Sequence, residues 1–212
     1  MAHRGAHFQR DYSKRQVNLR ALIDMDGVLC DFEAYFLEKF KEKYPDEPFI
    51  AVEDRDGFYI RDQYEKLKPG LNDKCSSIWN AKAFFLNIPV IPGAVEAAKE
   101  MQEIEGVDVF ICTSPVKAYK HCLKEKYQWV EKHMGKQWLD RILLVKDKTM
   151  VNGHLLIDDR PGISGLNPYP SWDHILFTQS HNSRMKNGQR RLENWTDGSW
   201  KDLIDEYKKR VA

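Results

Sequence analysis

The stretch ALIDMDGVLCDF (residues 21–32) decides the fold, because an apolar segment runs directly into a cluster of acids. Residues 19–23 are predicted to form a short buried strand, which ends at Asp24. Asp26 follows two residues later. Side chains alternate along a strand, but a turn that begins at Asp24 can bring both carboxylates toward one side. Gly27 allows the chain to turn sharply beside them.

Beyond this segment, apolar runs that are typical of buried strands alternate with amphipathic helical patterns. Further strands are expected at residues 107–112, 142–145, 155–157 and 175–177. Helices are expected at residues 94–104 and 116–134 and from Ser199 onward. The long middle helix is expected to carry its apolar stripe on Val116, Tyr119, Leu123, Tyr127, Val130 and Met134. This alternation predicts an α/β fold with a doubly wound parallel sheet that is covered on both faces.

The stretch from residue 33 to residue 92 interrupts the alternation and is predicted to be a small helical cap, inserted after the first strand. Its first helix shows an aromatic residue at every fourth position and stops at two prolines, and no later part resembles a strand of a parallel sheet. The expected organisation is a disordered tail (1–19), a core (20–32 and 93–212) and the cap (33–92).

Polar residues follow three further parts of the predicted sheet. Thr113 and Ser114 follow one strand, Asp158 and Asp159 follow another, and Lys148 lies in the loop after a third. Ligands of open α/β sheets bind outside the carboxyl ends of the strands. We therefore expect these side chains to share one cleft with the two acids of the first strand.

Such a cluster favours phosphoryl chemistry around a magnesium ion. Closely packed carboxylates repel one another, and Mg²⁺, which prefers oxygen ligands, relieves this repulsion. Lys148 and Thr113 can hold the oxygens of a phosphate. One acid of the Asp24-x-Asp26 pair can attack phosphorus, and the other can protonate the leaving group and then activate water.

The composition excludes several other classes of function. Lys plus Arg number 33 and Asp plus Glu number 32, so the net charge of +1 favours neither a nucleic-acid polymer nor a membrane as partner. The four cysteines are widely spaced, which indicates free thiols in a reducing compartment. Residues 1–19 are basic, but they are neither amphipathic nor Ser-rich. We expect a cytoplasmic protein, with the mitochondrial matrix as the alternative.

The segments DMDGV, CTS, Lys148 and LLIDD resemble, in this order, the four motifs of the haloacid dehalogenase (HAD) superfamily of phosphohydrolases. Longer segments resemble the 5′(3′)-deoxyribonucleotidases, both cytosolic and mitochondrial, from residue 20 onward: DMDGVLCDFEAYF, VFICTSPVKAYKHC, LLIDDRPGISG and PSWDHILFTQSHN. The resemblance implies a HAD-like Rossmannoid core, a homodimer, and Mg²⁺-dependent hydrolysis of deoxyribonucleoside 5′- and 3′-monophosphates such as dUMP and dTMP.

The resemblance also implies residue roles. Asp24 would be the nucleophile and would form an aspartyl-phosphate, and Asp26 would be the acid/base. Mg²⁺ would be held by the carboxylates of Asp24 and Asp159, with Asp158 beside them, and by the main-chain carbonyl of Asp26. The substrate would contact Asp26 and two further groups: Thr113, Ser114 and Lys148 at the phosphate, and Phe32, Phe58, Tyr59, Ile60 and Trp79 around the nucleoside. For Phe84 and Phe85 we expect ordinary packing within the cap.

The chain departs from the mitochondrial members in carrying Tyr59 in place of Trp and Lys146 in place of Arg. These departures bear on base preference and not on phosphotransfer. One alternative is a HAD phosphatase of another small phosphomonoester. A second, from a different class, is a phospho-acceptor signalling domain, which surrounds Mg²⁺ with a similar set of residues.

Overall fold

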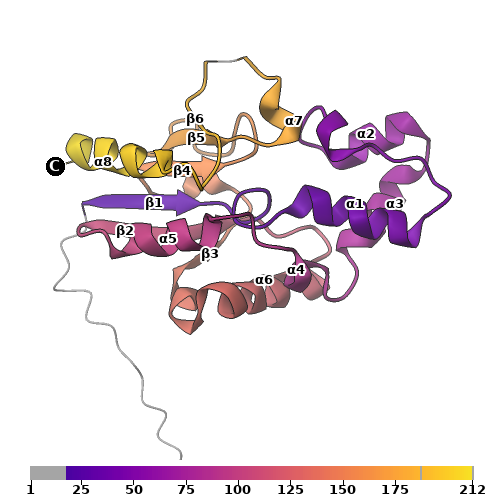
Figure 1. Cartoon of the computed structure of the whole chain (residues 1–212), viewed down its shortest axis with the longest axis horizontal. Helices are drawn as coiled ribbons and strands as arrows, with labels where there is room; N and C mark the ends of the chain where they lie inside the picture. Colours follow the sequence, from indigo (N-terminus) through magenta and orange to yellow (C-terminus); the bar gives the residue numbers. More distant parts are fainter. Residues whose placement is uncertain (1–17, 187, 212) are drawn as a thin grey trace, which may run out of the picture.

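The computed structural model describes residues 18–186 and 188–211, and it confirms the predicted fold class. Its parallel sheet has the strand order β3-β2-β1-β4-β5-β6 (Figure 1). The strands are β1 (Leu19–Ile23), β2 (Val107–Thr113), β3 (Ile142–Leu144), β4 (Leu155–Asp158), β5 (Asp173–Phe177) and β6 (Arg191–Leu192). The order places β1 between β2 and β4. Strands β2 and β3 are therefore added on one side of β1 and strands β4 to β6 on the other, and the point where the order reverses lies beside the predicted cleft.

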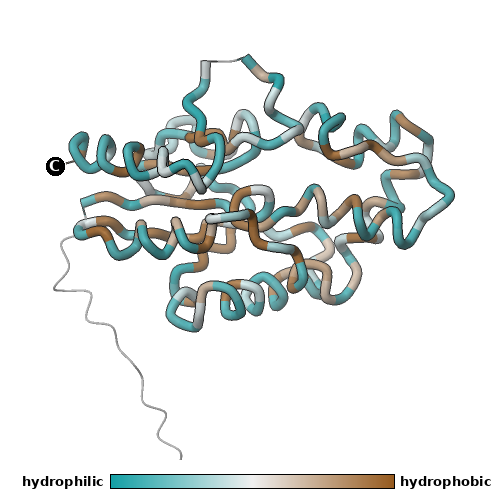
Figure 2. The backbone as a smooth tube through the Cα atoms, viewed as in Figure 1, coloured by the Kyte–Doolittle hydropathy of each residue, from teal (hydrophilic) through white to brown (hydrophobic). Residues whose placement is uncertain are grey.

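The first face of the sheet is covered by three helices: α5 (Ala94–Glu103), α6 (Tyr119–Met134) and α8 (Ser199–Val211). Alternate strand residues, such as Ala21 and Ile23 of β1, pack into this large apolar core. Figure 2 shows apolar residues along the central strands, whereas polar residues recur along each covering helix. The helices are therefore amphipathic because one side of each helix packs on the sheet.

The second face is covered differently. The remaining residues of the central strands form a smaller cluster, in which Leu22, Cys112 and Leu156 pack with Trp172. The cover consists of the 3-10 turn η4 (Lys148–Met150) and the chain between β4 and β5. Both faces are covered, as predicted, but here short connections replace long helices.

Residues 33–92 contain helices and no strand beyond an isolated bridge at Val90. The helices are α1 (Phe32–Lys43), η2 (Val52–Asp54), α2 (Ile60–Leu67), α3 (Leu71–Trp79) and α4 (Phe84–Asn87). Asp31 caps α1 by accepting a hydrogen bond from the Ala34 amide at 3.2 Å. In Figure 1, α1 to α3 lie beyond the carboxyl end of β1. They are therefore placed to overhang the strand ends.

Helix α6 holds residues 83–88, the segment that leads from these helices back to the sheet. Glu125 accepts hydrogen bonds from the amides of Ala83 and Phe85 at 2.7 and 3.2 Å. Trp129 Nε1 donates to the Ile88 carbonyl at 2.7 Å. The buried residues of α6 are Cys122, Glu125, Lys126, Trp129, Val130 and Met134.

The predicted apolar stripe of α6 was partly wrong. The side chains of Tyr119 and Tyr127 are 69% and 40% exposed. The helix is rotated so that a glutamate, a lysine and a tryptophan, which have polar partners inside the protein, face inward instead.

The predicted division into core and cap stays a prediction. The expected disordered tail lies outside the described residues, except for Asn18 and Leu19, and Leu19 begins β1. Within the described part of the chain, no helix combines the length and the apolar character needed to cross a membrane.

Candidate active site

The turn after β1 positions the first acid. The amide of Asp24 donates to the Ile157 carbonyl of β4 at 2.9 Å, and the turn closes with a 2.8 Å hydrogen bond from the Leu29 amide to the Met25 carbonyl. Gly27 has φ +75°, and a Cβ at this position would lie 2.0 Å from Asp159 Oδ2. Glycine is therefore required here both by the backbone conformation and by the close approach of a second acid.

Three buried carboxylates meet at this turn. Asp24, Asp158 and Asp159 each offer an oxygen, and these oxygens lie within 4.8 Å of one another. Lys148 Nζ lies 2.8 Å from Asp24 Oδ1 and 2.6 Å from Asp158 Oδ2. The structure thus brings the end of β1, the end of β4 and the η4 turn together at one edge of the sheet.

Burial dominates the electrostatics of this cluster. Burial raises the pKa of Asp24 to about 6, although Lys148 opposes the shift. The pKa of Asp159 lies well above its usual value because of burial and the charges of Asp158 and Asp24. Burial lowers the pKa of Lys148, but the two acids beside it outweigh burial, so the net shift is upward. Protein groups alone leave the acids short of positive charge.

The donor set fits a magnesium ion. Asp159 Oδ1 is buried and has no hydrogen-bond partner among the described residues. Both oxygens of Asp158 already accept hydrogen bonds, one from Lys148 and one from the Arg160 amide at 2.9 Å. Asp24 and Asp159 are therefore the better candidates for direct ligands, and Asp158 is better placed to orient its neighbours. Mg²⁺ prefers hard oxygen ligands and is usually bound through one or two carboxylates.

Asp26 lies apart from this cluster and has a partner of its own. Its Oδ2 accepts a 2.6 Å hydrogen bond from Lys126 Nζ. Lys126 is completely buried, and its Nζ also donates to Thr113 Oγ1 at 2.8 Å. The sequence interpretation missed Lys126. Its signal was a lysine on the same side of a helix as Cys122 and Trp129.

All twelve predicted site residues line one cavity of about 870 Å³. They are Asp24, Asp26, Phe32, Phe58, Tyr59, Ile60, Trp79, Thr113, Ser114, Lys148, Asp158 and Asp159. The acids and hydroxyls come from the strand ends and the lysine from the η4 turn, whereas most of the aromatic side chains come from residues 58–79. Phe84 and Phe85 are buried and do not line this cavity, as expected.

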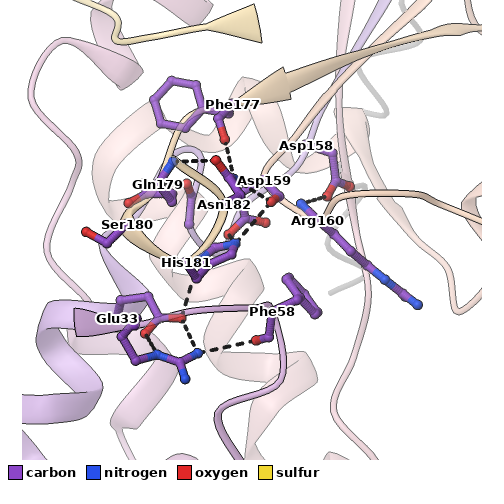
Figure 3. Close-up of polar contacts among 12 residues, drawn as sticks. Glu33, Phe58, Asp158, Asp159, Arg160, Phe177, Gln179, Ser180, His181 and Asn182 are labelled. Carbon is purple, nitrogen blue, oxygen red and sulfur yellow. Dashed lines mark hydrogen bonds and ion pairs between the residues drawn. The ribbon is translucent and has the colours of Figure 1, made fainter. Parts of the chain in front are cut away.

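A buried polar network that the sequence interpretation missed supports the loop of Asp159 (Figure 3). The Asp159 carbonyl accepts from Asn182 Nδ2 at 2.8 Å and lies 3.1 Å from His181 Nε2. His181 in turn lies beside Glu33, whose carboxylate binds Arg55 through contacts of 2.8 and 3.1 Å. The network connects the acidic cluster with α1 and with the segment before α2, and no short motif in the sequence marks it.

Solved structures share the fold at low sequence identity. One is the HAD hydrolase YfnB of Bacillus subtilis, described as bound to magnesium, with a TM-score of 0.56 and 14% identity over 91% of this chain and 100% of that chain. Another is a HAD hydrolase of Entamoeba histolytica, with a TM-score of 0.54 and 12% identity over 90% of this chain and 99% of that chain. These similarities place the core within the HAD fold.

Sequence relatives are much more similar. The mitochondrial 5′(3′)-deoxyribonucleotidase of Homo sapiens is 54% identical over 88% of this chain and 82% of its own, and that of Mus musculus is 51% identical over 95% and 93%. The human cytosolic type is 48% identical over 89% and 94%. A family model described as 5′ nucleotidase, deoxy (pyrimidine), cytosolic type C matches residues 18–209. The chain therefore belongs to the 5′(3′)-deoxyribonucleotidase family.

Proposed function

We propose that this protein is a Mg²⁺-dependent phosphomonoesterase that hydrolyses deoxyribonucleoside 5′- and 3′-monophosphates, such as dUMP and dTMP. One observation carries the proposal. Asp24 lies buried beside Lys148 at 2.8 Å, in a cavity that also holds the aromatic side chains of Phe58 and Trp79. Family membership supports a nucleotide substrate.

The proposed reaction has two steps. In the first, a carboxylate oxygen of Asp24 attacks phosphorus, the bond from phosphorus to the sugar oxygen breaks, and this oxygen takes a proton from Asp26. In the second, water attacks the aspartyl-phosphate and gives a proton to Asp26, and the bond between phosphorus and Asp24 breaks. The products are a nucleoside and inorganic phosphate.

The remaining polar residues hold the phosphate. Lys148, Thr113 and Ser114 would bind its oxygens, and Lys148 is kept charged by the acids beside it. When bound, Mg²⁺ would neutralise charge that develops on the transferring group. Asp24, Asp159 and the main-chain carbonyl of Asp26 would hold the ion.

The aromatic part of the cavity favours a base and a deoxyribose. Aromatic faces stack on bases, and Phe32 and Trp79 already lie with their ring centroids 6.1 Å apart. A ribose 2′-hydroxyl against an apolar wall would lose water without gaining a partner. Such a wall discriminates only modestly, on the order of a hundredfold.

The test is release of inorganic phosphate from deoxyribonucleotides, ribonucleotides and a sugar phosphate, with Mg²⁺ and with EDTA. We expect turnover of dUMP and dTMP only with Mg²⁺. Preferred turnover of the sugar phosphate would instead support the alternative phosphatase, and a long-lived phosphoprotein would support the signalling domain. Asp24→Asn should abolish turnover, whereas Asp205→Asn, on the exposed side of α8, should not. Substantial turnover by Asp24→Asn would refute the assigned nucleophile.

We further propose that the protein is a homodimer and is cytoplasmic, with the mitochondrial matrix as the alternative location. The curated relatives include both cytosolic and mitochondrial types, which supports these two compartments. Light scattering of the purified full chain tests the assembly, and imaging of the tagged full chain tests the compartment.

A further inference from the structure

A buried lysine lies behind the cavity and not within it. Lys126 is 0% exposed and is not among the residues that line the cavity. Its Nζ contacts Asp26 Oδ2 at 2.6 Å and Thr113 Oγ1 at 2.8 Å, and it lies 5.2 Å from the centroid of the Phe85 ring. A buried ammonium is costly unless it is paired and hydrogen-bonded, and this one has both kinds of partner. The three contacts together fix its position.

The ammonium sets the direction of the Thr113 hydrogen bond. An ammonium can only donate, so Thr113 Oγ1 must be the acceptor of the 2.8 Å contact. The hydroxyl hydrogen then has to point away from Lys126, and Thr113 lines the cavity. Phosphate oxygens are acceptors, so this arrangement prepares Thr113 to donate to a substrate phosphate.

The same ammonium gives the two carboxylate oxygens of Asp26 different environments. Oδ2 accepts from Lys126, whereas Oδ1 lies 3.7 Å from Cys30 Sγ, a weak donor. Oδ1 is thus the oxygen with capacity to carry and deliver a proton. The hydrogen bond from Lys126 to Oδ2 also restricts rotation of the carboxylate.

From this geometry we infer that Lys126 is a positioning residue for the reaction: it holds Asp26 so that Oδ1 faces the leaving oxygen, and it orients the Thr113 hydroxyl toward the phosphate. The inference rests on the proposed function, in which Asp26 is the acid of the first step. Lys126 does not line the cavity, so we assign it no direct contact with substrate or metal. Its removal should therefore slow proton delivery to a poor leaving group more than it slows attack on phosphorus.

Leaving-group acidity provides the test, because p-nitrophenolate leaves without protonation whereas the 5′-alkoxide of a nucleoside does not. Single-turnover release of deoxyuridine from dUMP, and of p-nitrophenol from p-nitrophenyl phosphate, would be measured for the Mg²⁺-loaded full chain. For Lys126→Met, we expect release from dUMP to fall about 100-fold and release from p-nitrophenyl phosphate to fall only about 3-fold. Equal falls for both substrates would overturn the inference.

Matched variants separate this inference from the proposed function. Lys124→Met removes an exposed lysine of the same helix and should stay within about 2-fold of the wild type for both substrates. Asp26→Asn should show the same selectivity as Lys126→Met. If Asp26→Asn is not selective, the proposed acid is wrong. If Asp26→Asn is selective and Lys126→Met is not, only the role of Lys126 is wrong.

Folding is checked by circular dichroism and thermal unfolding. If Lys126→Met does not fold, Lys126→Gln takes its place, because the amide keeps a donor without the charge. It should show the same preference for p-nitrophenyl phosphate in weaker form, and a uniform loss would again overturn the inference. Lys126→Arg, which keeps charge and donors, should recover part of the activity on dUMP.

Discussion

At the residue scale, the site buries more negative than positive charge, because three carboxylates meet beside one lysine. Asp24 illustrates the consequence: burial raises its pKa from 3.8 to about 6, even though Lys148 lies 2.8 Å away. A group that binds its proton more tightly in the folded protein stabilises the fold at low pH and loses this contribution as pH rises. The loss should occur between about pH 4 and the folded pKa of about 6.

Asp24→Asn should therefore change the pH dependence of stability in metal-free protein. A shift of about two pKa units corresponds to about 3 kcal/mol. Relative to the wild type, the variant should gain about this much unfolding free energy between pH 4 and pH 7.5. Burial lowers the pKa of His181, which has the opposite effect on stability, but this is common to both proteins and cancels in the difference. Urea unfolding in EDTA at a series of pH values measures this difference in unfolding free energy. A difference that does not change with pH would contradict the burial argument.

Single residues also show where sequence reasoning stops. Asp24 and Asp159 could be predicted, because each ends an apolar strand and the topology of parallel sheets brings strand ends together. Lys126 was missed, because a lysine in an amphipathic helix is normally assigned to the solvent side. Only the rotation of α6, which packs against α4, turns it inward.

At the scale of elements, buried ion pairs connect segments that are far apart in the sequence. Arg55 precedes α2, Glu33 lies in α1, and both side chains are less than 10% exposed. Arg55 also contacts the carbonyls of Gly57 and Phe58 at 3.4 Å, just before the aromatic lining of the cavity. The pair thus helps to hold Phe58 in place.

Arg55→Met should be strongly destabilising, because it leaves the Glu33 carboxylate buried without its partner, at a cost of about 3–5 kcal/mol. The double variant Glu33→Met/Arg55→Met should recover most of this loss. Arg61→Met is the matched control, since its pair with Asp73 is exposed and 3.8 Å long, and should cost less than about 1 kcal/mol. Urea unfolding of the four proteins gives the values. A double variant as unstable as Arg55→Met would show that packing, and not the unpaired charge, causes the loss.

A second connection joins the segment before α2 to the loop after β4. Arg160 Nη2 donates to Tyr59 Oη at 2.9 Å, and its guanidinium lies 5.6 Å from the Tyr59 ring centroid. Tyr59 is 55% exposed, so the hydrogen bond contributes modestly.

Tyr59→Phe should raise KM for dUMP up to about fivefold, with kcat nearly unchanged, because it removes one exposed hydrogen bond and no reacting group. Tyr169→Phe, at a side chain that is 88% exposed and outside the cavity lining, is the control and should leave both constants unchanged. Steady-state kinetics with dUMP measures KM and kcat for both variants. A fall in kcat with constant KM would place Tyr59 in the chemical step instead.

The elements themselves differ in how far the sequence predicts them. β1 was predicted with its observed bounds, and β2 and β4 each extend one residue beyond their predicted ends. Their short, mainly apolar runs predict buried strands. β6 was missed, because its two residues, Arg191 and Leu192, are too few to show a period and pair only through the tertiary structure.

At the scale of the whole molecule, the acidic cluster joins β1 to β4, so a bound metal ion should stabilise the entire fold. A ligand at 100 times its Kd stabilises the folded state by about 2.7 kcal/mol. For a chain of this length, each kcal/mol raises Tm by roughly 2–4 °C. Saturating MgCl₂ should therefore raise Tm by roughly 5–10 °C over EDTA.

Two carboxamide variants test which acids hold the ion through their side chains. Asp159→Asn should lose most of the Mg²⁺-dependent rise in Tm, because Asp159 Oδ1 is a buried oxygen without a hydrogen-bond partner in the described structure. Asp26→Asn should keep the rise, since the carboxylate of Asp26 is held by Lys126 and only its main-chain carbonyl would reach the metal. Both would be measured by thermal unfolding with MgCl₂ and with EDTA. Loss of the rise in Asp26→Asn, or its retention in Asp159→Asn, would reverse the assigned ligands.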